Sequence, residues 1–263
     1  MYLMPGMLLL LSCMAKQRCS ALRIQVQVPG VQRTYYQRAF HSQGPLRCSV
    51  GEADIVEADG IVAAEATEAA EAVGAVGVVS QSTVLPGHVY FVATPLGNMQ
   101  DITERARLTL THCDYVAAED TRHTVNLLRL LRIPHKQLIQ HHDHNLASSV
   151  PRIVSLVQAG HSVAVVSDAG TPGISDPGTE LAAALAAADL PLHPVPGPSA
   201  VAAALSICGF PCSPFTFMGF LPVKGLARRS ALETIACTTH TVVFYEAPHR
   251  IRRTLREIAE LGG

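Results

Sequence analysis

From Gly87 onward the sequence alternates between short apolar runs and amphipathic segments, and this alternation most constrains the fold. Strands are expected at 88–94, 114–118, 137–140, 162–166 and 192–195, and helices at 102–112, 121–132, 147–158, 179–188 and 200–208. Within 121–132, for example, Val125, Leu128 and Leu131 lie on one stripe of a helix. Strands that alternate with helices predict a parallel sheet covered by helices on both faces, so we expect an α/β fold.

After residue 210 the pattern starts again in a shorter form. Strands are expected at 215–219 and 241–246, and helices at 226–236 and 248–261, before the chain stops at Gly262-Gly263. An isolated sheet of two strands is marginally stable. We therefore expect an N-terminal αβα domain over 87–210 and an incomplete second αβα domain over 211–263, in a truncated or mispredicted form of a longer protein.

The first 86 residues differ in composition from the rest, and the folded part is expected to start near Gly87. Residues 1–50 contain Lys and Arg but no acid, whereas residues 51–80 contain Asp and Glu but no base. The basic segment is typical of a transit peptide that directs a protein to a chloroplast or mitochondrion. A secretory signal at 7–11 and a mispredicted start are the alternatives. Residues 51–86 are predicted to form a low-complexity, acidic, alanine-rich linker.

The composition argues against several classes of protein. No run of about 18 uncharged apolar residues occurs, so we expect no membrane-spanning helix, although 48% of the residues are apolar. The net charge of −1 does not by itself demand a nucleic-acid partner. The 7 cysteines lack disulfide and metal spacing, which favours reduced thiols in a reducing, cytoplasm-like compartment. Because Pro211 separates Cys208 from Cys212, we expect no metal site there.

The loops after the expected strands are rich in polar residues, glycine and proline. Ligands of parallel α/β sheets bind at the carboxyl ends of the strands, so these loops form the candidate site. Residues 167–178 (SDAGTPGISDPG) hold more polar groups than a helix cap needs, which favours a ligand site. Residues 94–98 fit either an ordinary turn or a ligand loop, and 195–200 fit either a helix cap at Ser199 or a ligand loop.

Two further polar segments follow expected strands. Glu119 and Asp120 stand just before Arg122 and His123. Carboxylates at a helix N-terminus are favourable for the helix dipole alone, but an acid pair beside a histidine can also orient or deprotonate a hydroxyl. Residues 141–145 (HHDHN) carry side chains that can bind metals. Since metal sites usually draw ligands from separate segments, we expect a polar loop near the site and no metal.

Several short stretches, taken together and in order, resemble one family. They are 94–98 (TPLGN), 101–103 (DIT), 118–124 (AEDTRHT), 142–145 (HDHN), 167–172 (SDAGTP), 176–178 (DPG), 196–198 (PGP), 219–222 (GFLP) and 244–246 (FYE). Residues 87–261 thereby resemble the ribosomal small-subunit methyltransferase I family, the 16S ribosomal RNA cytidine 2′-O-methyltransferases of the tetrapyrrole methylase superfamily. Residues 1–86 have no counterpart there, and the family's C-terminal third is absent here.

The resemblance implies a class III methyltransferase with two αβα domains, S-adenosylmethionine bound between them, and a homodimer. It implies 2′-O-methylation of a cytidine ribose in small-subunit ribosomal RNA. By motif it places cofactor contacts at Pro95, Leu96, Asp168, Ala169, Gly170, Thr171, Ser199, Ala200 and Met218. Such a displacement needs no metal and depends mainly on aligning donor and acceptor.

The chemistry implied by the resemblance also needs a base and cationic groups. A base or strong hydrogen-bond acceptor would assist the ribose hydroxyl, and the candidates are Glu119, Asp120, His123 and Glu246. The expected phosphate contacts are Lys224, Arg228, Arg229 and Arg250. Two alternatives stay open: a methylase of a tetrapyrrole or protein residue on the same fold, and an inactive, truncated form that only binds RNA.

Overall fold

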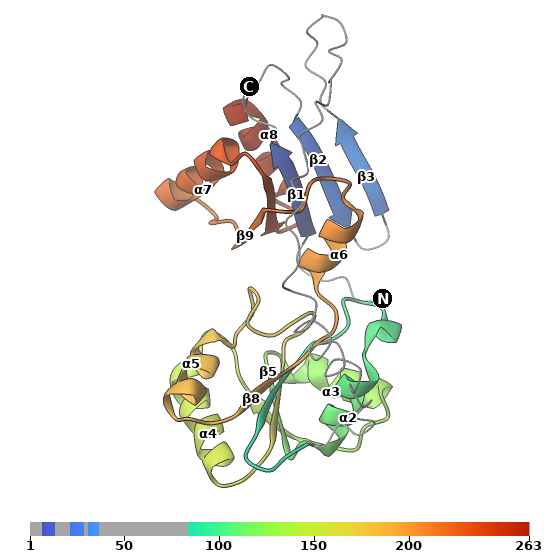
Figure 1. The fold of residues 1–263 in the computed structure, drawn as a ribbon, viewed down its shortest axis with the longest axis vertical. Helices are drawn as coiled ribbons and strands as arrows, with labels where there is room; N and C mark the ends of the chain where they lie inside the picture. Colours follow the sequence, from blue (N-terminus) through green and yellow to red (C-terminus); the bar gives the residue numbers. More distant parts are fainter. Residues whose placement is uncertain (1–6, 14–21, 29–30, 37–83, 263) are drawn as a thin grey trace, which may run out of the picture. The chain divides into compact units, whose positions relative to one another are not determined.

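The computed structural model describes residues 7–13, 22–28, 31–36 and 84–262 (Figure 1). One sheet is 5-stranded and parallel throughout, in the order β6-β5-β7-β4-β8. Its strands are β4 (Val89–Val92), β5 (Tyr115–Ala118), β6 (Gln137–Gln140), β7 (Val163–Val166) and β8 (Leu192–Val195). The α/β fold and the parallel first sheet expected from the alternation are confirmed.

Helices cover both faces of this sheet, because successive residues of a buried strand point to opposite sides. From β7, Ala164 and Val166 face the helices α2 (Glu104–His112) and α3 (Thr121–Leu130), whereas Val163 and Val165 face α4 (Leu146–Gln158) and α5 (Thr179–Ala187). Figure 1 shows α4 and α5 on one side of the sheet and α2 and α3 on the other. All residues of β7 are therefore buried, and the polar groups lie in the loops beyond the strand ends.

Side-chain caps fix where the helices near the site begin. The Thr103 hydroxyl accepts a hydrogen bond from the backbone N–H of Ala106 at 3.1 Å, so α2 begins at Glu104 and not at 102 as expected. A short 3-10 helix, η1 (Met99–Asp101), fills the space before it. Asp120 caps α3 in the same way, through the backbone N–H of Arg122.

The second sheet contains more than the two strands expected from the sequence. β9 (Phe215–Phe220) and β10 (Thr241–Glu246) are parallel, and β1 (Met7–Cys13), β2 (Leu22–Val28) and β3 (Val31–Tyr36) extend the sheet antiparallel in the order β3-β2-β1-β10-β9. The three added strands fall within the predicted transit peptide, which stays a prediction. Of the predicted linker, only 84–86 lies within the described residues.

Helices lie on both faces of the pair β9–β10. On one face, α7 (Gly225–Cys237) and α8 (Ile251–Gly262) pack around Phe244 and Val242. On the other face, α6 (Ala200–Ile207) packs against Val243. None of the helices among the described residues is long and apolar enough to cross a membrane.

Candidate active site

The loops after β4, β7 and β8 are joined at the carboxyl edge of the first sheet. Thr94 and Gly170 form a two-way backbone bridge, with N···O distances of 2.8 and 3.0 Å. The Thr171 hydroxyl donates to the carbonyl oxygen of Pro198 at 3.1 Å. These contacts follow from the neighbouring positions of β7, β4 and β8 in the sheet. All loops that the sequence analysis identified as ligand loops therefore meet at one edge.

Asp168 joins this edge to the segment after β5. Its carboxylate accepts a hydrogen bond from the backbone N–H of Asp120 at 3.2 Å and contacts Nδ1 of His123 at 3.0 Å. Its own backbone N–H donates to the Glu119 carboxylate at 3.4 Å. Because β5 and β7 are paired in parallel, these side chains from distant parts of the sequence become neighbours. The structure thus brings together Glu119, Asp120, His123 and Asp168.

The hydrogen bonds of the Asp120 carboxylate are made to the first turn of α3, the helix that Asp120 precedes. Besides capping α3, its carboxylate forms an ion pair with Arg122 at 2.6 Å. These hydrogen bonds to Arg122 hold the pKa of Asp120 well below its usual range. A carboxylate with so low a pKa is a poor base, so Asp120 fits a capping role better than proton abstraction.

Two other carboxyl groups at this edge have the opposite property. Burial raises the pKa of Asp176 to about 7, and the neighbouring charges of Glu119, Asp168 and Asp143 add to the effect. Burial also raises the pKa of Glu119 from its ordinary value. Asp176 was not among the predicted bases, although it lies in the 167–178 segment that was predicted to be a ligand loop. Carboxyl groups that titrate near neutrality are suited to accepting a proton.

One buried hydroxyl lies at the same place. The Ser167 side chain is buried, and its hydrogen bond to the Asp176 carboxyl lowers the pKa of that group, in opposition to burial. Ser167 Oγ therefore belongs to the polar lining of this edge.

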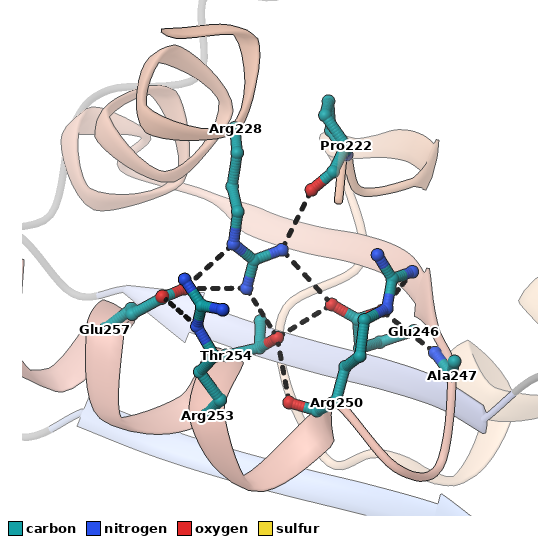
Figure 2. Close-up of polar contacts among 8 residues, drawn as sticks. All are labelled: Pro222, Arg228, Glu246, Ala247, Arg250, Arg253, Thr254 and Glu257. Atoms are coloured by element: carbon teal, nitrogen blue, oxygen red, sulfur yellow. Dashed lines mark hydrogen bonds and ion pairs between the residues drawn. The ribbon is translucent and has the colours of Figure 1, made fainter. Parts of the chain in front are cut away.

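Glu246, the remaining candidate base, lies inside the second domain, where cationic and hydroxyl groups surround it (Figure 2). It is fully buried. Its carboxylate contacts Arg250 at 2.6 Å, the Thr254 hydroxyl at 2.7 Å and Arg228 at 3.5 Å. A carboxylate enclosed in this way cannot reach a substrate hydroxyl, so the structure assigns Glu246 to folding and not to catalysis.

The same network changes the expected phosphate contacts. Arg228 is 4% exposed, and its guanidinium binds Glu257 at 2.6 Å, Thr254 at 2.8 Å and the carbonyl of Pro222 at 2.9 Å (Figure 2). Arg250 is likewise engaged with Glu246. Arg228 therefore has no N–H group left for a phosphate, whereas Nη1 of Arg250 is buried and makes no hydrogen bond among the described residues. Lys224 and Arg229, by contrast, are exposed on α7 and the residue before it.

The residues expected to contact the cofactor lie mostly at the edge where the loops meet. Pro95 and Leu96 follow β4, Ala169, Gly170 and Thr171 follow β7, and Ser199 and Ala200 stand at the start of α6. Ser199 occupies the N-cap position of α6, but its side chain makes no capping hydrogen bond. Met218 lies on β9 and packs against the core beneath α7 and α8.

The cysteines and histidines show no metal centre among the residues that the structure describes. The sulfur atoms of Cys208 and Cys212 lie 3.6 Å apart, because the turn after α6 folds back. Pro211 therefore does not keep these two side chains apart in space, as the sequence had led us to expect. His141 is buried and hydrogen-bonds Ser149 at 2.9 Å, which ties the 141–145 segment to α4.

Comparison with known proteins agrees with this architecture of parallel sheet and strand-end loops. The model of the tetrapyrrole (corrin/porphyrin) methylases matches residues 88–263. The chain belongs to this family.

Within the family, curated relatives named ribosomal RNA small subunit methyltransferase I are similar to this chain. The protein of Synechocystis sp. is 46% identical over 172 residues, which cover 65% of this chain and 61% of that protein. The protein of Xylella fastidiosa is 47% identical over 178 residues, which cover 68% and 65%. The protein of Escherichia coli O157:H7 is 43% identical over 177 residues, which cover 67% and 62%. The chain thus spans less than two thirds of the length of these relatives.

A solved structure of uroporphyrin-III-C-methyltransferase from Thermus thermophilus matches with a TM-score of 0.37 and 23% identity, over 52% of this chain and 64% of that one.

Removing Arg228 is expected to destabilise the fold strongly. Arg228→Ala would leave Glu246 buried with one fewer cation and Glu257 without its inner partner, at a cost of about 3–5 kcal/mol. The matched control is Arg229→Ala, whose side chain is 77% exposed and pairs with Glu233 on the surface, at a cost of about 0.5 kcal/mol. Urea unfolding of both variants measures this difference. Equal costs would contradict the structural role of Arg228.

Asp176 is expected to make stability fall as pH rises. Its pKa in the folded state is about 7, above the ordinary value of 3.8 for this carboxyl group. Between these values the folded chain keeps a proton that the unfolded chain loses, so stability decreases from about pH 4 to pH 7 and is constant above. Asp176→Asn should therefore be about 1–2 kcal/mol more stable than wild type at pH 8 after allowance for solvent screening, and equally stable near pH 3. Urea unfolding measures both variants, with the exposed Glu260→Gln as a control that should show no such difference between pH 3 and pH 8. Equal stability of Asp176→Asn and wild type at pH 8 would contradict the raised pKa of Asp176.

Proposed function

We propose that the chain binds S-adenosylmethionine at the carboxyl edge of its first sheet and directs methyl transfer to a cytidine ribose 2′-hydroxyl of small-subunit ribosomal RNA. The observation that carries the proposal is the meeting of the loops after β4, β5, β7 and β8 around Asp168. The names of the relatives support ribosomal RNA as the substrate. They give no support to a tetrapyrrole or protein acceptor.

The charge at this edge fits the proposed cofactor. Burial raises the pKa of Asp176 and Glu119, and the charges of Asp143 and Asp168 add to this effect, so a negative charge on either group is costly. S-adenosylmethionine carries a sulfonium and an ammonium group, and a cation placed here would offset that cost. It also carries hydroxyl groups, for which the Asp168 carboxylate is a complementary hydrogen-bond acceptor.

Backbone geometry at the edge also suits close approach of a ligand. Gly170 has a φ of 92°, a conformation that side-chain-bearing residues rarely adopt, and it holds the bridge to Thr94. The residues that would hold the cofactor are Pro95, Leu96, Asp168, Ala169, Gly170, Thr171, Ser199 and Ala200, with Met218 on the second sheet.

When bound, the cofactor supplies a methyl group activated by a positively charged sulfur. The task of the protein is to align the acceptor and to take the proton of its hydroxyl. Asp176 and Glu119 are the groups of this edge whose pKa is raised toward neutrality, and His123 contacts Asp168 beside them. We assign proton acceptance to this trio in place of Asp120 and Glu246, with Asp176 as the first candidate.

Exposed cations on the second domain would hold the RNA backbone. Lys224 and Arg229 stay in the proposed RNA surface, whereas the enclosed Arg228 and Arg250 leave it. The resemblance to the family supports a homodimer, and the basic composition of residues 1–50 supports an organelle location.

Asp168 is the residue whose loss should affect the cofactor most directly. Asp168→Ala removes a strand-end carboxylate and should weaken S-adenosylmethionine binding about 10- to 100-fold, the loss expected for one hydrogen bond to a charged group. Isothermal titration calorimetry measures the affinity, with Glu104→Ala as a control because that carboxylate is 65% exposed on α2. Unchanged affinity in Asp168→Ala would contradict the proposed role.

The RNA surface is tested by salt dependence. Replacing both Lys224 and Arg229 with Ala should weaken binding of small-subunit ribosomal RNA and lower the slope of log K against log salt by about 1 per lost contact. Arg152→Ala, which removes an exposed arginine of α4, is the control and should leave the slope unchanged. Identical slopes in all variants would argue against this surface.

A further inference from the structure

An aromatic group stands at the carboxyl ends of the parallel strands β9 and β10. Phe220 and Tyr245 occupy opposite positions on these strands. Their ring centroids lie 5.1 Å apart with a tilt of 56°, and Phe217 contacts the other side of Tyr245 at 5.0 Å. Tyr245 and Phe217 pack against the core that α6 covers, so the Phe220 ring is supported from behind.

Burial does not explain Phe220 itself. Its ring is held beside Tyr245, yet the residue is 50% exposed. The next residues toward α7 include Lys224, which is also exposed and forms no ion pair within the described part of the chain. A supported, half-exposed aromatic ring, followed four residues later by a cation without an ion pair among the described residues, combines an apolar surface with a group that can bind an anion.

Further contacts link this ring to the proposed active site. Gly219, the residue before Phe220, has a φ of 62°, and a Cβ there would come within 3.0 Å of Ser175 Oγ. Ser175 belongs to the loop that carries Asp176. Burial of the phenol, with a smaller effect from the charge of Asp176, raises the pKa of Tyr245 to about 12. The aromatic group therefore lies near the loop that carries Ser175 and Asp176.

We propose that Phe220 is a stacking platform for an unpaired nucleobase of the RNA substrate, supported by Tyr245, with Lys224 binding an adjoining phosphate. The proposal rests on the proposed function and adds to it the means by which the acceptor nucleotide is held. Proteins that read single-stranded RNA stack bases on aromatic side chains and bind the backbone with cations. A phosphate matches Lys224 in charge, and a base matches the flat apolar ring.

The chain contains no tryptophan, so Phe220→Trp introduces a single fluorophore at the platform. Stacking of a base on this indole should quench its emission. The probe is a short oligocytidylate, compared with an abasic ribose-phosphate oligomer of equal length and charge. We expect saturable quenching by the oligocytidylate and little by the abasic oligomer, with S-adenosylmethionine affinity unchanged by the substitution.

A second pair of variants distinguishes base stacking on Phe220 from nonspecific binding to exposed apolar side chains. Phe220→Ala should weaken oligocytidylate binding about 5- to 100-fold, since a base stacked on an aromatic ring contributes that much. Leu226→Ala removes an apolar side chain that is 86% exposed nearby, and it should have no effect. Circular dichroism and S-adenosylmethionine titration verify that both variants are folded.

Each alternative outcome overturns the proposal in a recognisable way. RNA binding that is normal in Phe220→Ala, or binding without quenching in Phe220→Trp, would reject the platform and leave the proposed function intact. Equal losses in Phe220→Ala and Leu226→Ala, together with a change in oligomeric state, would show a protein-docking surface instead. A wild-type chain that binds S-adenosylmethionine but no RNA would reject both the platform and the RNA substrate.

Discussion

Parallel pairing of β5, β7, β4 and β8 is the constraint on which the candidate site depends. Because these strands run in the same direction, their carboxyl ends lie along one edge, and residues far apart in the sequence meet there. An antiparallel bridge between Thr94 and Gly170 joins the loops that follow β4 and β7. Asp168 can therefore accept from the backbone of Asp120 although 48 residues separate them. A slip in register between β5 and β7 would separate the carboxylates that define the site.

Two buried carboxyl groups of this chain, Glu246 and Asp176, have opposite electrostatic environments. Around Glu246, Arg228, Arg250 and Thr254 supply charge and hydrogen bonds, so the negative charge is compensated inside the second domain. Around Asp176, burial raises the pKa, the charges of neighbouring carboxylates add to this effect, and no cation offsets it among the groups that act on Asp176. A compensated charge stabilises one structure, whereas an uncompensated one favours a proton or a cationic ligand. The surroundings of Glu246 and Asp176 therefore distinguish a carboxyl group that stabilises the fold from one suited to a ligand site, although both side chains are carboxylates.

Local patterns in the sequence were enough to predict the alternation of strands and helices and the polar loops that follow the strands. Burial of Arg228 was not predicted, because its charge favoured an exposed position. Arg228 nevertheless lies on the buried face of α7, at helical spacing from Leu232 and Ile235. The strand β1 was missed since its pairing with β10 joins segments more than 200 residues apart, which no local pattern reveals, and β2 and β3 join the sheet only through β1. The raised pKa of Asp176 depends on neighbours that only the fold assembles.

The nature of the methylated product tests the central claim most directly. The full chain would be incubated with small-subunit ribosomal RNA and S-adenosylmethionine labelled in its methyl group, and the RNA would then be digested with alkali. A methyl group on a ribose 2′-oxygen blocks cleavage of the adjoining phosphodiester, so the account predicts label in alkali-resistant dinucleotides that begin with cytidine. Label found only in mononucleotides, or on a tetrapyrrole and not on RNA, would contradict it.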